Sequence, residues 1–246
     1  MKKIIFITGS SKGLGLELAE AFLNLDWIVV GISRSNKIKH PNFYFLKNDL
    51  STESKLTDKI EKLLEKNKLN QKYSEVVLIN NAAMVLPINY AHKISEKDIR
   101  QSYQLNLHSP MILSQWLISK FLKKSVPLTI CNLSSGAALR PIVNWSIYCT
   151  MKSALKMFTD CLQQDYAAYS HFKVFSFYPG VMDTSMQATI RKQKASHFKN
   201  VEYFKDLKEK NNLLPASKVA KVISQILSRP NEICKIEYNI KDFMHE

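Results

Sequence analysis

Short apolar segments of strand length alternate with helical patterns along the whole chain of 246 residues. This alternation predicts a parallel sheet with helices on both faces, because parallel neighbours need a crossover connection. No linker rich in Pro, Gly or Ser divides the sequence, and no internal repeat is visible. We therefore expect one doubly wound α/β domain over residues 1–246. Its seven strands should lie near residues 3–8, 27–32, 43–47, 75–80, 128–133, 172–177 and 233–239.

The first strand pattern, residues 3–8, runs directly into the glycine-rich segment Gly-Ser-Ser-Lys-Gly-Leu-Gly at residues 9–15. A helical pattern follows, and its apolar face holds Leu14, Leu18, Phe22 and Leu25. Glycines let the backbone approach a pyrophosphate, and the first turn of a helix offers free N–H groups at its positive dipole end. The order of strand, turn and helix predicts a dinucleotide site, although a glycine-rich turn without any ligand is the simpler alternative.

The second strand pattern ends at Ser33 and Arg34. An enzyme that prefers NAD places an acidic residue here, which binds the 2′-hydroxyl of the adenosine ribose. No such acid is present, and Arg34 and Lys12 can instead hold a 2′-phosphate. These residues favour NADP(H) as the cofactor, unless both are simply solvated cations on a lysine-rich surface.

Tyr148 and Lys152 are four positions apart in a helical pattern, so both side chains lie on one face. A nearby ammonium group favours the phenolate and lowers the pKa of a tyrosine, which produces a group that can donate and accept a proton. Ser135 comes shortly before, just after the apolar run 128–133, and can hydrogen-bond the same substrate oxygen. Taken alone, a tyrosine and a lysine at this spacing are more often an ordinary surface pair.

Taken together, these motifs resemble those of the short-chain dehydrogenases/reductases. The matching segments are Thr8–Gly15, Asn80–Ala83, Asn106, Ser135, Tyr148, Lys152 and Tyr178–Val181, and they span essentially the whole chain. The resemblance implies a Rossmann fold and an oxidoreductase that uses a nicotinamide dinucleotide. Ala83 stands where the family usually has glycine, and it is strained there if the position needs a positive φ.

The resemblance also implies a catalytic set, which consists of Ser135, Tyr148, Lys152 and Asn106. Ser135 and Tyr148 would hold the carbonyl oxygen of the substrate, and Lys152 would hold the nicotinamide ribose and lower the pKa of Tyr148. Asn106 would complete a proton relay from Lys152 to solvent through water. We therefore expect NADPH-dependent reduction of a small carbonyl substrate.

The cofactor site implied by the resemblance surrounds the carboxyl ends of the strands. Asp49 would bond the adenine, and Asn81 with Ala82 would line the adenosine ribose. The expected cofactor-binding residues are Gly9, Ser11, Lys12, Gly13, Leu14, Gly15, Arg34, Asp49, Leu50, Asn81, Ala82, Tyr148, Lys152, Pro179, Gly180, Met182 and Thr184. No metal site is expected.

Stretches within residues 134–187 are also similar to those of two groups in this family, the bacterial benzil reductases that form (S)-benzoin and the sepiapterin reductases. The first group implies reduction of an aromatic diketone such as benzil to a chiral hydroxyketone, with Trp145 and Met186 against the substrate. Reduction of a pterin ketone, or a dinucleotide sensor without enzymatic activity, are open alternatives. The resemblance places a substrate lid at the lysine-rich residues 183–212, which can equally be two amphipathic surface helices.

The net charge of +14 comes from lysines that are spread along the chain and interleaved with acidic residues. No cluster of basic and aromatic residues stands out, so we expect no nucleic-acid partner. The first apolar run ends at Gly9, too early for a signal sequence, and no run reaches the ~18 apolar residues of a membrane span. Four cysteines without metal-ligand spacing favour free thiols in a reducing compartment. We expect a cytoplasmic enzyme without membrane contact, and the family resemblance implies a homodimer or homotetramer.

Overall fold

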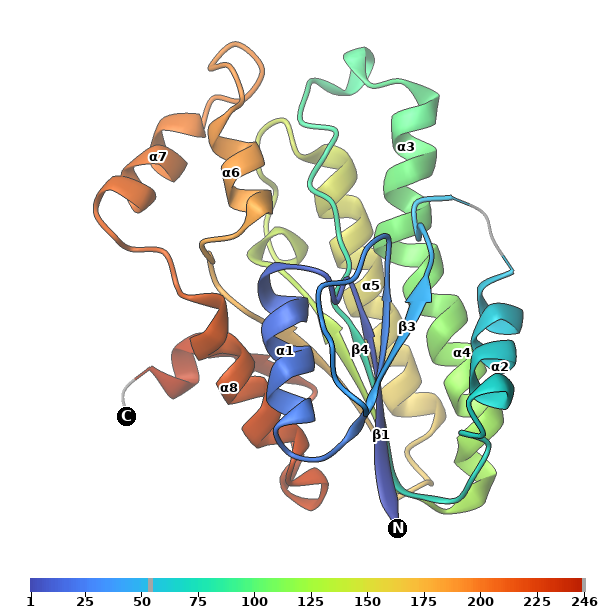
Figure 1. Ribbon diagram of the computed structural model, residues 1–246. Coiled ribbons are helices and arrows are strands. Elements are labelled where there is room, and N and C mark those ends of the chain that lie inside the picture. The colour runs from blue at the N-terminus through green and yellow to red at the C-terminus, as the bar shows by residue number, and fades with distance from the viewer. Residues whose placement is uncertain (53–54, 245–246) are drawn as a thin grey trace.

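Seven parallel strands form one sheet in the computed structural model, which describes residues 1–52 and 55–244. From edge to edge the strands are β3 (Phe43–Lys47), β2 (Ile28–Ser33), β1 (Lys2–Thr8), β4 (Tyr73–Asn80), β5 (Leu128–Leu133), β6 (Phe172–Tyr178) and β7 (Glu237–Asn239), as Figure 1 shows in part. The expected doubly wound parallel sheet is confirmed. Because the strand order reverses between β1 and β4, their carboxyl ends form the crevice where open α/β sheets bind ligands.

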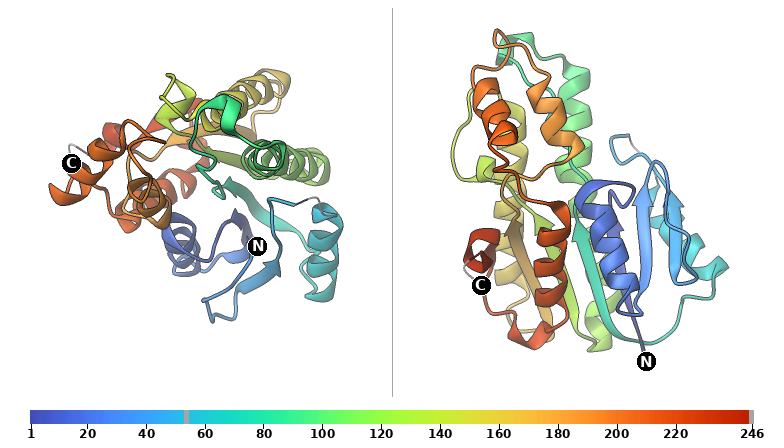
Figure 2. Two further views of the ribbon diagram at one scale, coloured as in Figure 1. Left: turned by 90° about the horizontal axis from the view of Figure 1, so that it is seen from above. Right: turned by 60° about the vertical axis from the view of Figure 1, so that its left-hand side comes forward.

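Helices cover both faces of this sheet (Figure 2). One face carries two helices that pack together, α1 (Gly13–Leu23) and α8 (Ala216–Leu227). The opposite face carries α2 (Leu56–Lys66), α4 (Ser109–Phe121) and α5 (Ser146–Asp165). A further helix, α3 (Glu96–Tyr103), continues through the π-helix Gln104–His108 into α4.

The strands are buried from both sides, as their apolar sequences require. Every residue of β2 and of β5 is buried. In β1, Ile5 and Ile7 join the core under α1 and α8, whereas Ile4 and Phe6 join the core under α2 and α4. Side chains of a strand point alternately to the two faces of a sheet, so one apolar run supplies both cores.

Two details differ from the sequence patterns. The last strand covers only residues 237–239, because a short 3-10 turn precedes it and Ile233 enters the core without pairing to β6. Leu25, expected on the buried face of the first helix, is 50% exposed. It lies beyond the end of α1, where the chain turns through a positive φ at Asp26. In both places an apolar residue lies just outside the strand or helix, so the apolar pattern of the sequence is longer than the strand or helix itself.

Residues other than glycine occupy left-handed backbone positions in this glycine-poor chain. Within residues 1–52 and 55–244, those that are exposed and follow helices are Asp26, Lys68, Ser125 and Asn211. Asn144 also has a positive φ, of 65°, but it precedes α5 and is buried. Asparagine tolerates this conformation better than most residues. Asn144 is thus buried at a kind of turn that elsewhere in this fold faces solvent.

Residues 183–213 stand above the carboxyl ends of the strands and carry α6 (Ser185–Arg191) and α7 (Val201–Glu209), as seen in Figure 1. The two ends of this segment meet at its base, where Met182 and Leu214 form a parallel bridge. Backbone hydrogen bonds of 3.0 and 2.9 Å accompany that bridge. The entrance and the exit of the segment are therefore held side by side.

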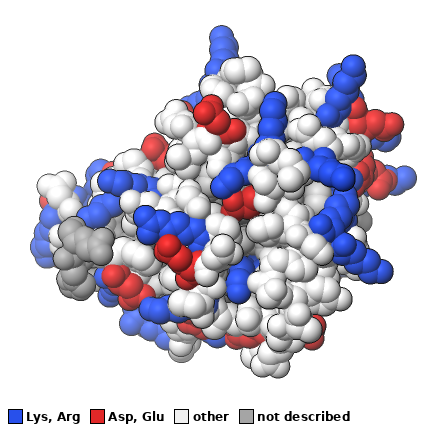
Figure 3. All heavy atoms as spheres, turned by 90° about the horizontal axis from the view of Figure 1, so that it is seen from below, with Lys and Arg blue, Asp and Glu red and all other residues white. Residues whose placement is uncertain are grey.

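Basic side chains do not gather in one patch on the face at the amino ends of the strands. Figure 3 shows lysine and arginine spread over that face, with acidic groups between them. In the part of the chain that the structure describes, no helix is long and apolar enough to cross a membrane. The same residues contain no group of three or more His, Cys, Asp or Glu side chains placed to hold a metal ion.

Candidate active site

The carboxyl end of β5 and the first turns of α5 bring three of the predicted residues together. Ser135 follows β5, and its hydroxyl lies near enough to the phenol of Tyr148 on α5 to favour the phenolate. Tyr148 and Lys152 are buried, with 6% and 3% of their surfaces exposed. Ser135 also accepts a hydrogen bond from the backbone N–H of Ala137 (3.2 Å), which orients its side chain. Two hydroxyl groups therefore lie together and can hold one oxygen atom.

The electrostatics of Tyr148 differ from the expectation. Burial raises the pKa of Tyr148 to about 12, although the hydrogen bond with Ser135 acts in the opposite direction. Lys152 does not reverse this shift, because its ammonium group donates to the Leu133 carbonyl (2.6 Å) and lies 5.9 Å from the centre of the tyrosine ring. Burial also lowers the pKa of Lys152 to about 8. The prediction of a lowered tyrosine pKa is therefore wrong for this structure, and the phenol keeps its proton at neutral pH.

The turn after β1 is braced by a closed set of hydrogen bonds. The hydroxyl oxygen of Thr8 accepts from the backbone N–H groups of Asn81 and Ala82, both at 2.9 Å. The side-chain amide of Asn81 in turn donates to the Thr8 carbonyl (2.8 Å). The Asn81 side chain, expected at the adenosine ribose, thus holds the ends of β1 and β4 together.

Close packing explains the glycines of this turn. Gly9 and Gly13 have positive φ values of 71° and 54°. A Cβ on Gly15 would lie 2.3 Å from the carbonyl oxygen of Gly9, so only glycine lets α1 approach the turn. α1 also begins without a side-chain cap, so no capping side chain occupies its first N–H groups. Such an uncapped first turn is suited to bind a phosphate.

Other predicted cofactor residues gather around the turn. Thr184 lies beside Gly13, where an added Cβ would be 3.5 Å from the threonine methyl group. On the other side, a hydrogen bond from the Ser51 hydroxyl lowers the pKa of Asp49, and the positive charge of Arg34 contributes to the same shift. The fold therefore brings residues that follow β1, β2, β3 and β6 to one edge of the sheet.

The remaining predicted cofactor residues differ in whether their side chains are exposed to solvent. Side chains that reach the surface at least in part are those of Ser11, Lys12, Arg34 and Met182. Buried side chains are those of Leu14, Leu50 and Pro179, so these residues can face a cofactor only with backbone atoms. Gly180 has a positive φ of 71°, which lets the chain turn as it leaves β6.

Asn106 lies in the π-helix between α3 and α4 and is 1% exposed. Its amide oxygen accepts from the Met84 N–H and its amide nitrogen donates to the Met84 carbonyl, both at 2.9 Å. The amide nitrogen also donates to the Ser102 hydroxyl (3.0 Å). The side chain thus fixes the segment that follows β4, with both of its hydrogens engaged. Ala83 in that segment does not have a positive φ, so the strain considered for it is absent.

Residues 183–213 pack directly over Tyr148. Trp145 stacks on Phe198 and Phe204, with ring centroids 5.4 and 5.7 Å apart, and it meets Tyr148 edge-on at 5.5 Å. Met186 is partly buried in the same cluster. The two predicted substrate residues, Trp145 and Met186, therefore share an apolar cluster with the predicted catalytic tyrosine. The sequence shows Phe198 and Phe204 only as apolar residues among the lysines of that segment, and it does not reveal their contact with Trp145.

Asp183 connects the base of this segment to its helices. Its carboxylate binds Lys208 on α7 at 2.6 Å and lies 4.0 Å from Arg191 at the end of α6. A buried hydrogen bond from the Gln187 amide to the Phe204 carbonyl (3.1 Å) also ties the two helices together. Asp183 is therefore engaged by two cations of the segment itself.

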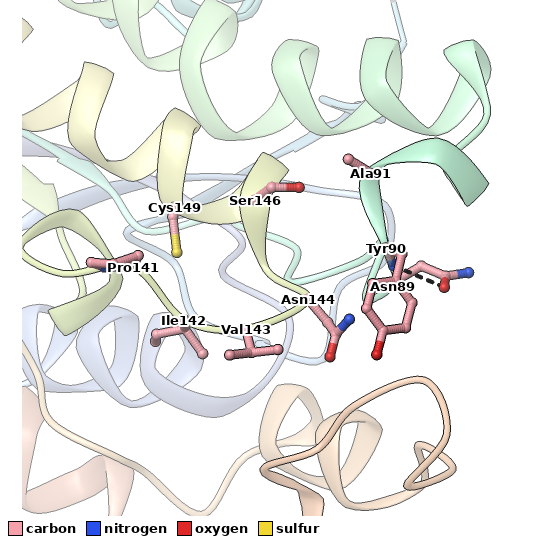
Figure 4. Close-up of a pocket in the computed structure, with 9 residues that line it drawn as sticks. All are labelled: Asn89, Tyr90, Ala91, Pro141, Ile142, Val143, Asn144, Ser146 and Cys149. Carbon is pink, nitrogen blue, oxygen red and sulfur yellow. Dashed lines mark hydrogen bonds between the residues drawn. The ribbon is translucent and has the colours of Figure 1, made fainter.

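Buried polar atoms beside the aromatic cluster have no hydrogen-bond partner among the described residues. They are Nδ2 and Oδ1 of Asn144 and Nε1 of Trp145. An unpaired buried polar group costs roughly 1–3 kcal/mol, so each needs an explanation. Asn144 also lines a cavity of about 240 Å³ between residues 89–91 and 141–149 (Figure 4). No motif in the sequence marks Asn144, since only the fold shows that its amide is buried.

Known proteins match nearly the whole chain. A family model described as short chain dehydrogenase matches residues 3–195. Benzil reductase ((S)-benzoin forming) from Bacillus subtilis (strain 168) is 36% identical over 98% of this chain and 100% of its own. A protein of the same name from Bacillus cereus is 32% identical over 92% of this chain and 94% of its own. A solved short chain dehydrogenase/reductase from Saccharomyces cerevisiae has a TM-score of 0.81 at 24% identity, covering 97% of this chain and 96% of its own.

Proposed function

Because this chain belongs to the short-chain dehydrogenase family and is therefore an oxidoreductase acting on a carbonyl or an alcohol, we propose that it reduces aromatic ketones with NADPH as the hydride donor. The observation that carries this proposal is the pair of neighbouring hydroxyl groups on Ser135, which is partly exposed, and Tyr148, which is buried, with Lys152 one helical turn away. Two hydroxyl groups at one point suit a carbonyl oxygen, which has two lone pairs to accept hydrogen bonds.

The residues around the first helix fit a dinucleotide. Gly9 and Gly15 let the turn, α1 and Asn81 pack closely together, and α1 offers uncapped N–H groups to the pyrophosphate. We place the 2′-phosphate of NADPH at Arg34 and Lys12, whose side chains are exposed on this edge of the sheet. Because β2 ends at Ser33 without an acid, nothing there favours the ribose hydroxyl of NADH instead.

Each residue of the catalytic set then has a distinct task. Bound NADPH supplies the hydride that is added to the carbonyl carbon. Ser135 and Tyr148 donate hydrogen bonds to the carbonyl oxygen, and the raised pKa of Tyr148 keeps its proton available until negative charge develops on that oxygen. The ammonium group of Lys152, present below a pH of about 8, stabilises the phenolate that remains. Asn106 holds Met84 in place at the neighbouring strand end.

We propose a vicinal aromatic diketone such as benzil as the substrate and residues 183–213 as the lid over it. The relatives that carry the name benzil reductase match over at least nine-tenths of this chain, and the rings of Trp145, Phe198 and Phe204 suit aryl groups. A pterin ketone, as in sepiapterin reduction, is less favoured. Asp183, the acid available to bind a pterin, is held by Lys208 and Arg191.

Substrate-dependent oxidation of NADPH tests this proposal. Purified protein is given benzil, sepiapterin or a simple aryl ketone, and the product of benzil is resolved on a chiral column. We expect fast reduction of benzil to one enantiomer of the hydroxyketone, since one face of the carbonyl would meet the hydride. Racemic product would contradict a fixed substrate, and fast turnover of sepiapterin without turnover of benzil would favour the pterin ketone. Absence of all turnover would leave the dinucleotide sensor.

A further inference from the structure

We propose that Asn144 and Trp145 form an oxygen-binding subsite that selects ketones with a second acceptor oxygen next to the carbonyl that is reduced. This inference rests on the proposed function and deepens it. Asn144 precedes Tyr148 by four residues, and Trp145 contacts the tyrosine ring edge-on. The subsite would therefore adjoin the Ser135–Tyr148 pair, and it would hold the part of the substrate that does not react.

The cavity next to Asn144 has the right character for this part of a substrate. Figure 4 shows the 89–91 loop on one side and the start of α5 with its preceding loop on the other. The backbone N–H of Asn89 donates to the Asn144 carbonyl (3.1 Å), so the two loops are held at a fixed separation. None of the residues that line the cavity is charged. A neutral oxygen on an aryl ketone suits such walls better than a carboxylate, whose charge would lose its hydration.

The backbone conformation of Asn144 does not explain its buried amide. A positive φ favours asparagine or glycine, and the exposed left-handed residues of this fold meet that demand with their side chains in water. Asn144 is 9% exposed, and both atoms of its amide group lack a partner among the described residues. Glycine would satisfy the turn without burying an unpaired amide. A ligand oxygen that accepts a hydrogen bond here supplies the missing partner of Nδ2.

The unpaired atoms define the chemistry of that ligand. Nδ2 of Asn144 and Nε1 of Trp145 are donors, so they call for an acceptor such as a carbonyl oxygen. The indole N–H of Trp145 can bind an oxygen while its ring still stacks on Phe198 and Phe204. A vicinal diketone offers one oxygen to Ser135 and Tyr148 and the other to this subsite. Holding both oxygens would also fix which face of the carbonyl is reduced.

A pair of matched substrates tests the subsite. Benzil and deoxybenzoin have the same two phenyl rings, but deoxybenzoin has a CH2 group in place of the second carbonyl. We expect Asn144→Gly, which keeps the positive φ, to lower the ratio of kcat/KM for benzil to that for deoxybenzoin about tenfold, the effect of one hydrogen bond. Trp145→Phe, which keeps a stacked ring but removes the N–H, should lower the same ratio. Asp26→Gly makes a comparable change at an exposed positive-φ position remote from the site and should leave the ratio as it is.

Binding without turnover separates this inference from the proposed function. The stabilisation of the protein by benzil, measured as a thermal shift with NADP+ present, should be smaller for Asn144→Gly than for the wild type. That result supports the subsite even if benzil is not reduced, in which case the proposed substrate fails alone. Equal shifts for the two proteins, no shift for the wild type, or an unchanged ratio of kcat/KM would each overturn the subsite. Reduction of deoxybenzoin by the wild type would still support the carbonyl reductase.

Discussion

The turn after β1 and the loop before α5 lie at the same edge of the sheet, yet they treat their buried polar groups in opposite ways. At the turn, Thr8 and Asn81 satisfy each other and the backbone of the next strand. At the loop, the amide of Asn144 and the indole N–H of Trp145 find no partner among the described residues. A self-satisfied network keeps its shape without a ligand, whereas unpaired groups gain most when a ligand arrives. The first region is therefore expected to keep its shape without a ligand. The second is expected to distinguish ligands that accept a hydrogen bond there from those that do not.

Of the substitutions considered, Tyr148→Phe should show the largest difference between its effect on turnover and its effect on NADPH binding. The phenol is the proposed proton donor, so its loss should reduce turnover about 10²–10⁴-fold, the usual contribution of general acid catalysis. NADPH binding, followed by cofactor fluorescence, should change little because the ring and its contact with Trp145 remain. Parallel loss of turnover and NADPH affinity would show that the cofactor and substrate regions are not independent, and retained turnover would remove Tyr148 from the mechanism.

Thr8→Val should break the rigid region. It removes the oxygen that accepts from the N–H groups of Asn81 and Ala82, which should lower the free energy of unfolding by about 2–4 kcal/mol in denaturant titrations. Thr8→Ser keeps the hydroxyl and should lose far less. Asn144→Gly, which removes an amide without a partner among the described residues, should not lower the free energy of unfolding, because that buried amide is itself a cost of about 1–3 kcal/mol. A larger loss for Asn144→Gly than for Thr8→Val would reverse the comparison.

Arg34→Ala should act only on the cofactor side. Loss of a charge-assisted hydrogen bond to the 2′-phosphate costs about 1.5–3 kcal/mol, so KM for NADPH should rise roughly tenfold to a hundredfold. KM for NADH and for benzil should stay near the wild-type values. Lys37→Ala, another exposed cation after β2, is the control. Equal effects on both dinucleotides would exclude a contact between Arg34 and the 2′-phosphate.

The pH dependence of reduction should report on Lys152. Its pKa is lowered to about 8 by burial, so the ammonium group is present below that pH and is lost above it. Because the charged form stabilises the phenolate, kcat should be level below pH 8 and should then fall up to about tenfold per pH unit. A pH profile of kcat under saturating NADPH measures this. A flat profile to pH 10 would mean that the charge of Lys152 is not needed.

Lys208→Ala should have the smallest effect, because it touches only the attachment of the lid. Its ion pair with Asp183 is half exposed and is worth about 0–1 kcal/mol. We expect kcat/KM for benzil to change by no more than about fivefold, with NADPH binding unaffected. Lys210→Ala removes an exposed pair within the same part of the chain and should have no effect. A large loss for Lys208→Ala would mean that Asp183 has a direct role in the site.

Local spacing made the fold and the place of the candidate site within it predictable. The glycine turn, Tyr148 and Lys152 depend on neighbours within a few residues, and Ser135 depends on the end of a strand that its apolar run already indicates. The alternation of strand and helix patterns then determines that these segments meet at the carboxyl ends of the sheet. Two details differ from their patterns: Ile233 is apolar without belonging to β7, and Leu25 lies beyond the end of α1.

Properties that depend on burial were not predictable. The pKa of Tyr148 depends on how completely its surroundings exclude water from the phenol, and that burial raises the pKa to about 12. The amides of Asn81 and Asn106 are engaged with the backbone of Thr8 and of Met84, contacts that the sequence pattern does not reveal. That the amide of Asn144 is buried and without a partner among the described residues follows only from its three-dimensional surroundings. Each of these properties depends on contacts between residues that are far apart in the sequence.

The bridge between Met182 and Leu214 has a consequence for how such an enzyme can diversify. A segment whose entrance and exit are adjacent can be lengthened, shortened or replaced without changing the distance that the chain must span elsewhere. Its aromatic residues shape the space over Tyr148, while the sheet and the dinucleotide turn are built from other parts of the chain. The length and sequence of residues 183–213 can therefore change, and substrate preference with them, while the sheet and the dinucleotide turn stay the same.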